Sequence, residues 1–326
     1  MSKSMVVTVI LLAIFLLCSP SSVAILLNKL QLPPPVIGPE ALAFDRNGGG
    51  PYVTSSDGRI FKYVGPSEGF KEYAYTSPNR NRTICDGFSD FSNIQAICGR
   101  PLGLGFNHQT GDLYAADGYY GLVKVGPNGG KATQLVGPAQ SNSTVFANGL
   151  DVDSNTGIVY FTIASTKFQP KDFPTALLTG GIGDNSGSLL SYDPSNNQTT
   201  VFLRNLTFAS GVAVSGDGSF VLVSEYFANR IRRVWLKGPK ANSSDLFMLL
   251  AGRPDNIKRN SRGQFWIAVN TVTLSSGVRV TENGIVLQIV SLVEEYGLEA
   301  ASEVQEYNGT LYGGSLLASY AIIFTP

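Results

Sequence analysis

A short hairpin pattern organises the hydrophobic and polar positions of this chain. In the stretch ANGLDVDSNTGIVYFT, residues 147–162, apolar and polar residues alternate over 150–153, apolar and β-branched residues fill 158–162, and Thr156 and Gly157 close the turn between predicted strands at 148–153 and 158–162. An alternating run and an apolar run on the two sides of a Gly-containing turn are typical of a β-hairpin. The sequence therefore predicts two adjacent antiparallel strands here.

The same hairpin pattern recurs along the chain. Related stretches begin at Pro39, Pro101, Ala209, Pro254 and Ala301, and the first of these is the loosest copy. The residues at the equivalent position of the six copies are Glu40, Leu102, Asn148, Ser210, Asp255 and Ser302. They are separated by 62, 46, 62, 45 and 47 residues, a period in which one four-stranded blade of a β-propeller is completed. We therefore predict an all-β fold, a six-bladed β-propeller with a central channel.

The composition agrees with one such domain. The 326 residues are 43% apolar and 15% charged, so the chain can bury a large core. We expect a single propeller over residues 25–326. The 24 basic and 24 acidic side chains form no runs, which argues against a nucleic-acid or anionic-membrane ligand. A small-molecule substrate is the better expectation, and protein partners stay unassigned.

The first 24 residues have the pattern of a cleaved signal peptide. Lys3 precedes an apolar run over residues 5–17, and residues 22–24 have the small-x-small pattern of a cleavage site. The run is too short for a typical membrane span, so we expect no stable membrane anchoring. This predicts the secretory pathway, with the endoplasmic reticulum lumen and vacuole, or the extracellular space, as destination. Six glycosylation sequons agree with it: Asn81, Asn142, Asn197, Asn205, Asn242 and Asn308.

Two cysteines, Cys85 and Cys98, remain after the predicted signal peptide. In an oxidising compartment they are expected to form a disulfide that closes a short loop before the second repeat, and two buried free thiols are the alternative.

A second irregularity is the long segment 166–187, inserted between the second and third strands of blade three, which includes a predicted short helix at 174–178. We expect it to cap the channel mouth, with a disordered surface loop as the alternative. Residues 27–33 are expected to add a strand to the last blade and close the ring.

Candidate chemistry lies where the first strands of the blades meet. Because these strands line the axis of a propeller, the six equivalent residues should form a ring at one opening, with Asn256 and Glu303 one position further along. Polar side chains at strand ends can also simply satisfy backbone hydrogen bonds. Leu102, Ser210, Tyr119 and Tyr120 are candidate substrate-binding residues, although aromatic residues at blade junctions are often core residues.

Eight short motifs resemble those of the plant strictosidine synthase-like proteins, in the same order: GPEALAFD, YYGLVKVGP, TGIVYFT, LSYDPS, FVLVSE, RIRRVWLKGPK, GRPDNI and GQFWIA. The resemblance covers nearly the whole chain after the signal peptide. It implies a six-bladed propeller with one disulfide before blade two, resident in the endoplasmic reticulum or vacuole.

The founding activity of that family is the condensation of tryptamine with the aldehyde secologanin, in which a glutamate at the start of the last blade is the general base. Aligning EVQEYNGTLYGGSL with the last blade places Ser302 at that glutamate, and a serine hydroxyl cannot act as this base. Glu303 follows, but strand alternation is expected to turn it away from where Ser302 points, unless a bulge intervenes. The only histidine, His108, lies in a predicted turn. We therefore expect no strictosidine synthase activity, and keep a condensation that uses Glu303 as an alternative.

The chain also resembles calcium-dependent paraoxonase and gluconolactonase propellers, which hold a metal with a glutamate, asparagines and an aspartate. This resemblance implies a Ca²⁺ site at Glu40, Asn148, Asp255 and Asn256, with Ser210 standing where an asparagine is expected. It favours an ester or lactone hydrolase, with Glu40, Asp255, Ser302 and Glu303 as candidate catalytic residues. A non-catalytic secreted propeller that binds a metabolite is the alternative from another class, and a protein-interaction propeller is less favoured.

Overall fold

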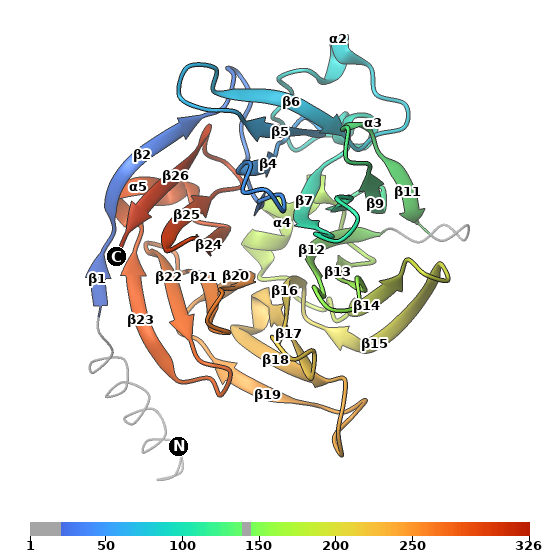
Figure 1. Ribbon diagram of the computed structural model, residues 1–326, viewed down its shortest axis with the longest axis vertical. Coiled ribbons are helices and arrows are strands. Elements are labelled where there is room, and N and C mark those ends of the chain that lie inside the picture. The colour runs from blue at the N-terminus through green and yellow to red at the C-terminus, as the bar shows by residue number, and fades with distance from the viewer. Residues whose placement is uncertain (1–20, 139–144) are drawn as a thin grey trace.

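Six sheets surround a central axis in the computed structural model of the chain, which describes residues 21–138 and 145–326 (Figure 1). The predicted all-β propeller with six blades is confirmed. Blades one to three are β3 (Leu42–Ala43), β4 (Tyr52–Thr54), β5 (Arg59–Tyr63) and β6 (Phe70–Tyr75); β7 (Pro101–Phe106), β8 (Leu113–Asp117), β9 (Gly121–Val125) and β11 (Thr133–Val136); and β12 (Phe146–Val152), β13 (Val159–Ser165), β14 (Gly187–Asp193) and β15 (Gln198–Leu206).

Blades four to six complete the ring. They are β16 (Ala209–Val214), β17 (Phe220–Glu225), β18 (Arg230–Trp235) and β19 (Ser244–Leu249); β20 (Arg253–Arg259), β21 (Phe265–Asn270), β22 (Ser275–Val280) and β23 (Val286–Ser291); and β24 (Glu303–Tyr307), β25 (Thr310–Gly314), β26 (Tyr320–Thr325) and β2 (Ile25–Gln31). Two short strands, β10 (Gly130–Lys131) and β1 (Ser21–Val23), pair in parallel with the outer strands β6 and β23.

The ring closes between the two ends of the chain. Strand β2 pairs antiparallel with β26, with Ile25 opposite Thr325 and Gln31 opposite Tyr320. The prediction that an N-terminal segment supplies a strand to the last blade is confirmed, since β2 overlaps the predicted residues 27–33. This pairing supplies the outer strand of the sixth sheet, and it satisfies backbone groups of β26 that would otherwise be unpaired.

Apolar residues pack between neighbouring blades. One cluster joins Ala41 and Ile60 of the first blade to Leu104 and Val123 of the second. Similar clusters join the second blade to the third and the fourth to the fifth. The strands are apolar on both faces because each sheet is covered by a neighbour on both sides.

Most inner strands have an irregularity at their start. The register of the inner hairpin shifts between Pro101 and Gly103, between Ala147 and Leu150, between Ala209 and Val212, and between Pro254 and Ile257. In the sixth blade the pairing of β24 with β25 has no such shift. A bulge leaves extra residues on one strand and re-aims their side chains, so the leading residues of blades two to five differ in direction from that of blade six.

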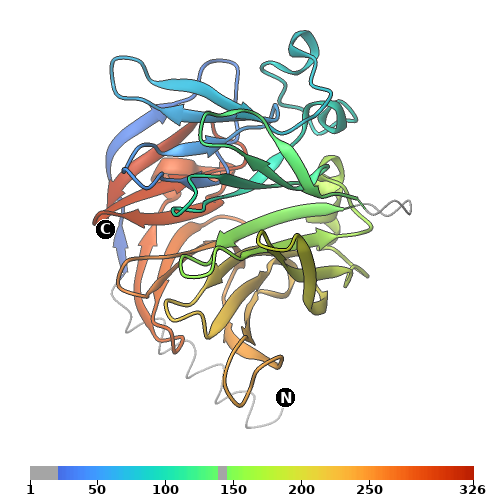
Figure 2. The ribbon, with the colours of Figure 1, turned by 45° about the vertical axis from the view of Figure 1, so that its right-hand side comes forward.

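Two insertions and a few short helices decorate this frame. The first insertion holds α2 (Arg82–Cys85) and α3 (Gln95–Cys98), which the Cys85–Cys98 disulfide joins with Cα atoms 5.3 Å apart. The predicted disulfide is therefore confirmed, and this loop projects beyond the sheets in Figure 2. The second insertion holds η1 (Pro170–Asp172) and α4 (Phe173–Thr179), and α4 confirms the predicted helix.

The remaining short helices are η2 (Tyr226–Ala228), α5 (Val293–Tyr296) and η3 (Gly297–Glu299). None of the helices found in residues 21–138 and 145–326 is long and apolar enough to cross a membrane.

The sequons that the structure describes lie on the surface. Their asparagines, Asn81, Asn197, Asn205, Asn242 and Asn308, are all exposed. All of these except Asn81 have a positive φ. Asn142 and most of the predicted signal peptide, residues 1–20, lie outside the described residues. Residues 21–23, at the end of that predicted peptide, form β1.

Candidate functional site

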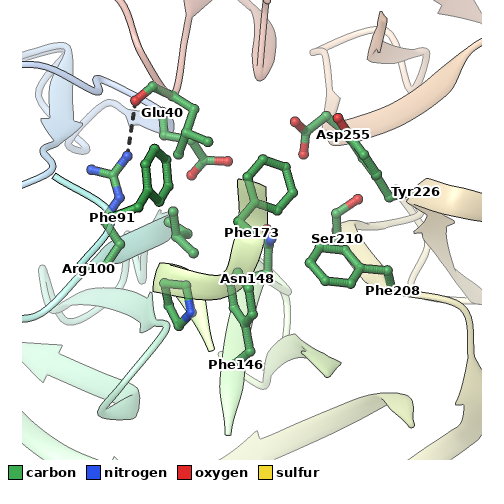
Figure 3. A pocket seen from close by; sticks show the side chains of 13 residues that line it. Glu40, Phe91, Arg100, Phe146, Asn148, Phe173, Phe208, Ser210, Tyr226 and Asp255 are labelled. Atoms are coloured by element: carbon green, nitrogen blue, oxygen red, sulfur yellow. Dashed lines mark hydrogen bonds between the residues drawn. The ribbon is translucent and has the colours of Figure 1, made fainter. Parts of the chain in front are cut away.

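A pocket at one mouth of the channel gathers the starts of five inner strands (Figure 3). The cavity is small, about 30 Å³. Its lining from the repeated hairpins consists of Glu40, Leu102, Asn148, Ser210 and Asp255. These are five of the six equivalent residues of the repeat, so the repeat does bring its leading side chains to one place. Bulges aim four of them at the pocket, because blades two to five shift register at these positions.

Glycines allow the inner strands to approach one another closely below the pocket. A Cβ atom on Gly103 would lie 2.4 Å from the carbonyl oxygen of Asn148, and one on Gly149 would lie 2.2 Å from that of Ser210. A Cβ atom on Gly211 would lie 2.5 Å from the carbonyl oxygen of Asp255. Each glycine directly follows a leading residue, so it sets the spacing between the side chains that surround the pocket.

The sixth leading residue, Ser302, does not line the pocket, and the expectation that it completes the ring is wrong. Its side chain is buried, and its hydroxyl donates a 2.7 Å hydrogen bond to the carbonyl oxygen of Glu40. The physical reason is this hydrogen bond, which holds the Ser302 side chain against the backbone of the first blade. Blade six also has no register shift, so Ser302 lies just before β24 rather than in a bulge like those of blades two to five. Ser302 therefore ties the last blade to the first.

Glu303 lies inside the channel and is fully buried. Its Oε1 accepts a 2.8 Å hydrogen bond from the Leu42 N–H, and its Oε2 lies 3.3 Å from Nζ of Lys258. Because side chains alternate along a strand, Ser302 and Glu303 do point in different directions. Glu303, however, points into the channel beneath the pocket and not away from the channel. Burial raises the pKa of Glu303 to about 7, against the opposing charge of Lys258.

Two carboxyl groups face the pocket itself. Burial raises the pKa of Asp255 to about 8, and the charge of Glu303 adds to this rise. Burial also raises the pKa of Glu40 well above its ordinary value, as does the neighbouring Asp255, while Arg100 acts in the opposite direction. Figure 3 shows the Glu40 and Asp255 carboxyl groups directed into the same space. Acidic groups crowded in this way hold protons near neutral pH unless a cation joins them.

Two buried oxygen atoms in the pocket lack a hydrogen-bond partner. Glu40 Oε1 accepts a 3.2 Å hydrogen bond from Asn256 Nδ2, but Glu40 Oε2 and Asn148 Oδ1 are buried without a hydrogen bond. Carboxylate and amide oxygens are ligands that Ca²⁺ takes, so Glu40, Asn148 and Asp255 fit such an ion. Asn256 would add an oxygen only after its amide turned over. No group of three or more acidic, His or Cys side chains suited to a metal occurs in the described parts of the chain, so amide oxygens and water would have to complete the shell.

Aromatic side chains enclose these polar groups, among them four phenylalanines that the sequence did not single out as site residues. The five rings that line the pocket belong to Phe91, Phe146, Phe173, Phe208 and Tyr226. Phe91 comes from the disulfide-bridged loop, and Phe173 begins α4, so both insertions reach the pocket. The available signal was the position of these insertions, one before blade two and one within blade three. Which of their residues point inward depends on their folded path.

Arg100 is another lining residue that the sequence did not single out. It directly precedes β7, and its position next to the disulfide-bridged loop was the only signal. Tyr119 and Tyr120, in contrast, do not line the pocket. The Tyr119 hydroxyl donates to Gln95 Oε1 and accepts from the Lys171 N–H, and the Tyr120 hydroxyl donates to the carbonyl oxygen of Ala96. These two tyrosines brace the insertions, and this is a correction to their predicted role in substrate binding.

The sole histidine, His108, is far from this chemistry. It is exposed, in the turn between β7 and β8, and it lines a separate cavity together with Phe44, Asp151 and Lys258. No catalytic dyad with histidine is therefore available at the pocket.

Comparison with known proteins agrees with this architecture. A family model described as strictosidine synthase matches residues 148–239. The protein strictosidine synthase-like 12 of Arabidopsis thaliana is 44% identical, over 90% of this chain and 88% of its own length. The chain belongs to the strictosidine synthase-like family. Strictosidine synthase of Catharanthus roseus is 36% identical, over 90% of this chain and 85% of its own length.

Solved structures similar to this strictosidine synthase-like chain share its fold at low sequence identity. Regucalcin from Agrobacterium tumefaciens, described as a calcium-binding protein, superposes with a TM-score of 0.63 at 12% identity and covers 94% of this chain and 95% of its own. A gluconolactonase from Xanthomonas campestris has a TM-score of 0.57 at 13% identity, covering 94% and 98% of the two chains. At these identities the similarity establishes the propeller fold alone.

Proposed function

We propose that this strictosidine synthase-like protein is a small-molecule hydrolase that acts on an ester or lactone at the channel mouth with the help of a bound divalent cation. The observation that carries the proposal is the pair of unpaired buried acceptors, Glu40 Oε2 and Asn148 Oδ1, in one pocket with the Asp255 carboxyl group. Buried acceptors without partners destabilise a fold unless something binds them. A hard cation would coordinate both acceptors and would neutralise the negative charge of the carboxylates.

In this proposal each polar residue has a role. Glu40 and Asn148 would hold the cation, and the Asp255 carboxyl group lies in the same pocket. When bound, Ca²⁺ would supply Lewis-acid polarisation of the substrate carbonyl. Asp255 takes the proton of the attacking water, because no described residue forms a hydrogen bond with its carboxyl group. Asn256 holds Glu40 in place through its bond to Oε1.

The aromatic lining supports an apolar substrate. A cavity of about 30 Å³ admits a water molecule or an ion but no organic molecule. Substrate entry therefore requires Phe91 and Phe173 to turn aside, and both belong to insertions rather than to the rigid sheets. Their rings would then cover the apolar part of the bound substrate and exclude water.

We assign no amine–aldehyde condensation to the site. The resemblance to the family implies that Ser302 takes the position of its catalytic glutamate, and the Ser302 hydroxyl is bonded to backbone. Glu303 is buried beneath the pocket and engaged by Leu42 and Lys258. Neither residue offers a free base to a substrate at the channel mouth. For the compartment, the disulfide and the exposed sequons support the secretory pathway, since disulfides persist in oxidising compartments.

Calorimetric titration with Ca²⁺, followed by a panel of esters and lactones, tests the proposal. Wild type is expected to bind Ca²⁺ and to turn over at least one substrate, and Glu40→Gln is expected to lose both. Glu294→Gln removes the same charge from an exposed helix position and should leave both unchanged. Absence of both heat and turnover in folded wild type would contradict the hydrolase. Binding without turnover would instead support the alternative of a propeller that binds a metabolite.

A further inference from the structure

Arg100 is a buried cation on the side of the pocket opposite Asp255 (Figure 3). Only 2% of the residue is exposed. Burial lowers the pKa of its guanidinium to about 10, so the group is still charged at neutral pH. A buried charge needs hydrogen-bonding partners, because removing it from water is otherwise strongly unfavourable.

The guanidinium has few partners within the protein. Its Nη2 donates a 3.1 Å hydrogen bond to the carbonyl oxygen of Leu316, and its Nη1 is buried without an acceptor. In residues 21–138 and 145–326 no carboxylate oxygen lies within 4.0 Å of it, whereas the buried Glu225 and Asp57 each have an arginine in contact. Glu40 acts on the Arg100 guanidinium only through electrostatic attraction, without a hydrogen bond.

The surrounding backbone holds this unusual position. The Arg100 N–H donates to Asp117 Oδ2 at 2.8 Å, and the Gly118 N–H donates to the Arg100 carbonyl oxygen at 2.9 Å. Gly38 has a φ of +79°, and a Cβ atom there would lie 2.8 Å from both Nη1 and Nη2. The missing side chain of Gly38 therefore makes room for the guanidinium, and the site is built around it.

We propose that Arg100 is an anion subsite of the pocket and binds the carboxylate group of a ligand. A planar carboxylate matches the donor geometry of a guanidinium and would satisfy the unpaired Nη1. The apolar part of the ligand would lie among Phe91, Phe146 and Phe173. The ligand class is thus an aromatic or otherwise apolar carboxylic acid.

The inference deepens the proposed function, on which it rests for its place in the reaction. Hydrolysis forms a bond between the water oxygen and the acyl carbon and breaks the bond from that carbon to the alcohol oxygen. The alcohol leaves with one proton, and the acid loses the other to give a carboxylate. Arg100 is positioned to hold this product, or a carboxylate already present on the substrate. The other interpretation is that Arg100 serves only as a distant countercharge for Glu40.

Binding of phenylacetate and of its neutral isostere phenylacetamide separates these interpretations. Titrations in EDTA exclude any contribution of a cation, so they report on Arg100 and not on the hydrolase. Wild type is expected to bind phenylacetate more tightly, and Arg100→Met should weaken phenylacetate about 10- to 100-fold, the range for a hydrogen bond to a charged group, with phenylacetamide unchanged. Arg100→Lys keeps the charge but not the paired donors of the guanidinium, so its affinity for phenylacetate should lie between those of wild type and Arg100→Met. Arg204→Met removes an exposed arginine of β15 and serves as control.

Two results would overturn the subsite: equal binding of both compounds by wild type, or an equal loss of both in Arg100→Met and Arg100→Lys. Thermal melts establish that each variant is folded, and Arg100→Lys carries the test if Arg100→Met does not fold. Loss of carboxylate selectivity in a protein that neither binds Ca²⁺ nor hydrolyses esters would keep the subsite and reject the hydrolase. The reverse combination would keep the hydrolase and reject the subsite.

Discussion

The hydroxyl of Ser302 donates to the backbone carbonyl of Glu40 over 2.7 Å, and this bond joins the last blade of the propeller to the first. Both residues lead their copies of the repeat, but only Glu40 lines the pocket. The contribution of the sixth repeat to the channel mouth is therefore a structural tie, and the acidic chemistry comes from the first and fifth blades.

Ser302→Ala is expected to destabilise the protein without removing activity or Ca²⁺ binding. The substitution leaves the buried carbonyl oxygen of Glu40 without this donor, which typically costs about 1–3 kcal/mol. Urea denaturation measures the loss, and the lactone panel with Ca²⁺ titration measures the function. Loss of turnover in a protein of nearly wild-type stability would instead give the serine hydroxyl a role in the chemistry.

Gly149→Ala is expected to reduce stability because the inner strands of blades three and four approach too closely for a side chain. Its Cβ atom would lie 2.2 Å from the carbonyl oxygen of Ser210, which is backbone and cannot turn aside. Overpacking of this kind costs typically about 1–3 kcal/mol. Gly126→Ala is the matched control, since no atom lies within 4 Å of its added Cβ. Equal stability of the two variants would refute the close approach.

Lys258 and Glu303 should behave as one unit in the channel. The ammonium group lies 3.3 Å from Glu303 Oε2 and donates a 3.0 Å hydrogen bond to the carbonyl oxygen of Leu104, so it links blades two, five and six. Lys258→Met leaves a buried carboxylate unpaired, and such changes cost about 3–5 kcal/mol. Lys258→Met combined with Glu303→Gln should recover much of that loss. A double-mutant cycle of denaturation measurements tests it, and additive effects would show that the two groups are independent.

Acid is expected to weaken the fold through Asp57. Burial alone would raise the pKa of Asp57, but hydrogen bonds from Arg59, the Gly87 N–H and Ser55 bring it below its ordinary value of 3.8. A lowered pKa in the folded state contributes stability above about pH 3.8, and this contribution disappears as the pH falls through the folded-state value. The stability advantage of wild type over Asp57→Asn should therefore shrink below about pH 4.

An exposed aspartate provides the comparison for this pH effect. Asp90→Asn removes the same charge from an exposed position of the disulfide-bridged loop, and its stability should follow the wild-type curve. Denaturation midpoints measured between about pH 6 and pH 3 distinguish the two variants. A constant difference between wild type and Asp57→Asn across this range would exclude the proposed linkage.

The fold could be predicted from the sequence because the hairpin pattern is local and repeated. The same repeat located Glu40, Asn148 and Asp255, since equivalent positions of a propeller must meet at its axis. It failed at Ser302 and Glu303 because a register shift of one or two residues decides which side chain faces the channel, and blade six lacks the shift found in blades two to five. No hydrophobic pattern encodes that difference.

The residues that enclose the site could not be predicted in the same way. Phe91 and Phe173 lie in insertions outside the repeat, and their direction follows from the disulfide and from contacts made only in the folded chain. Arg100 immediately precedes a strand, where an arginine is ordinarily exposed. Its burial depends on Gly38, which is 62 residues away in sequence but adjacent in space. Such distant pairs leave no periodic signal.

Pairing of β2 with β26 makes the order of synthesis matter for folding. The ribosome delivers the first strand of this sheet long before the last one, so the N-terminal segment must remain without its partner while the intervening blades form. Contacts between residues so far apart in sequence form slowly because a long loop must close first. The ring can be completed only after the C-terminal residues have emerged, and until then both edges of the incomplete ring are open to a chaperone or to another nascent chain.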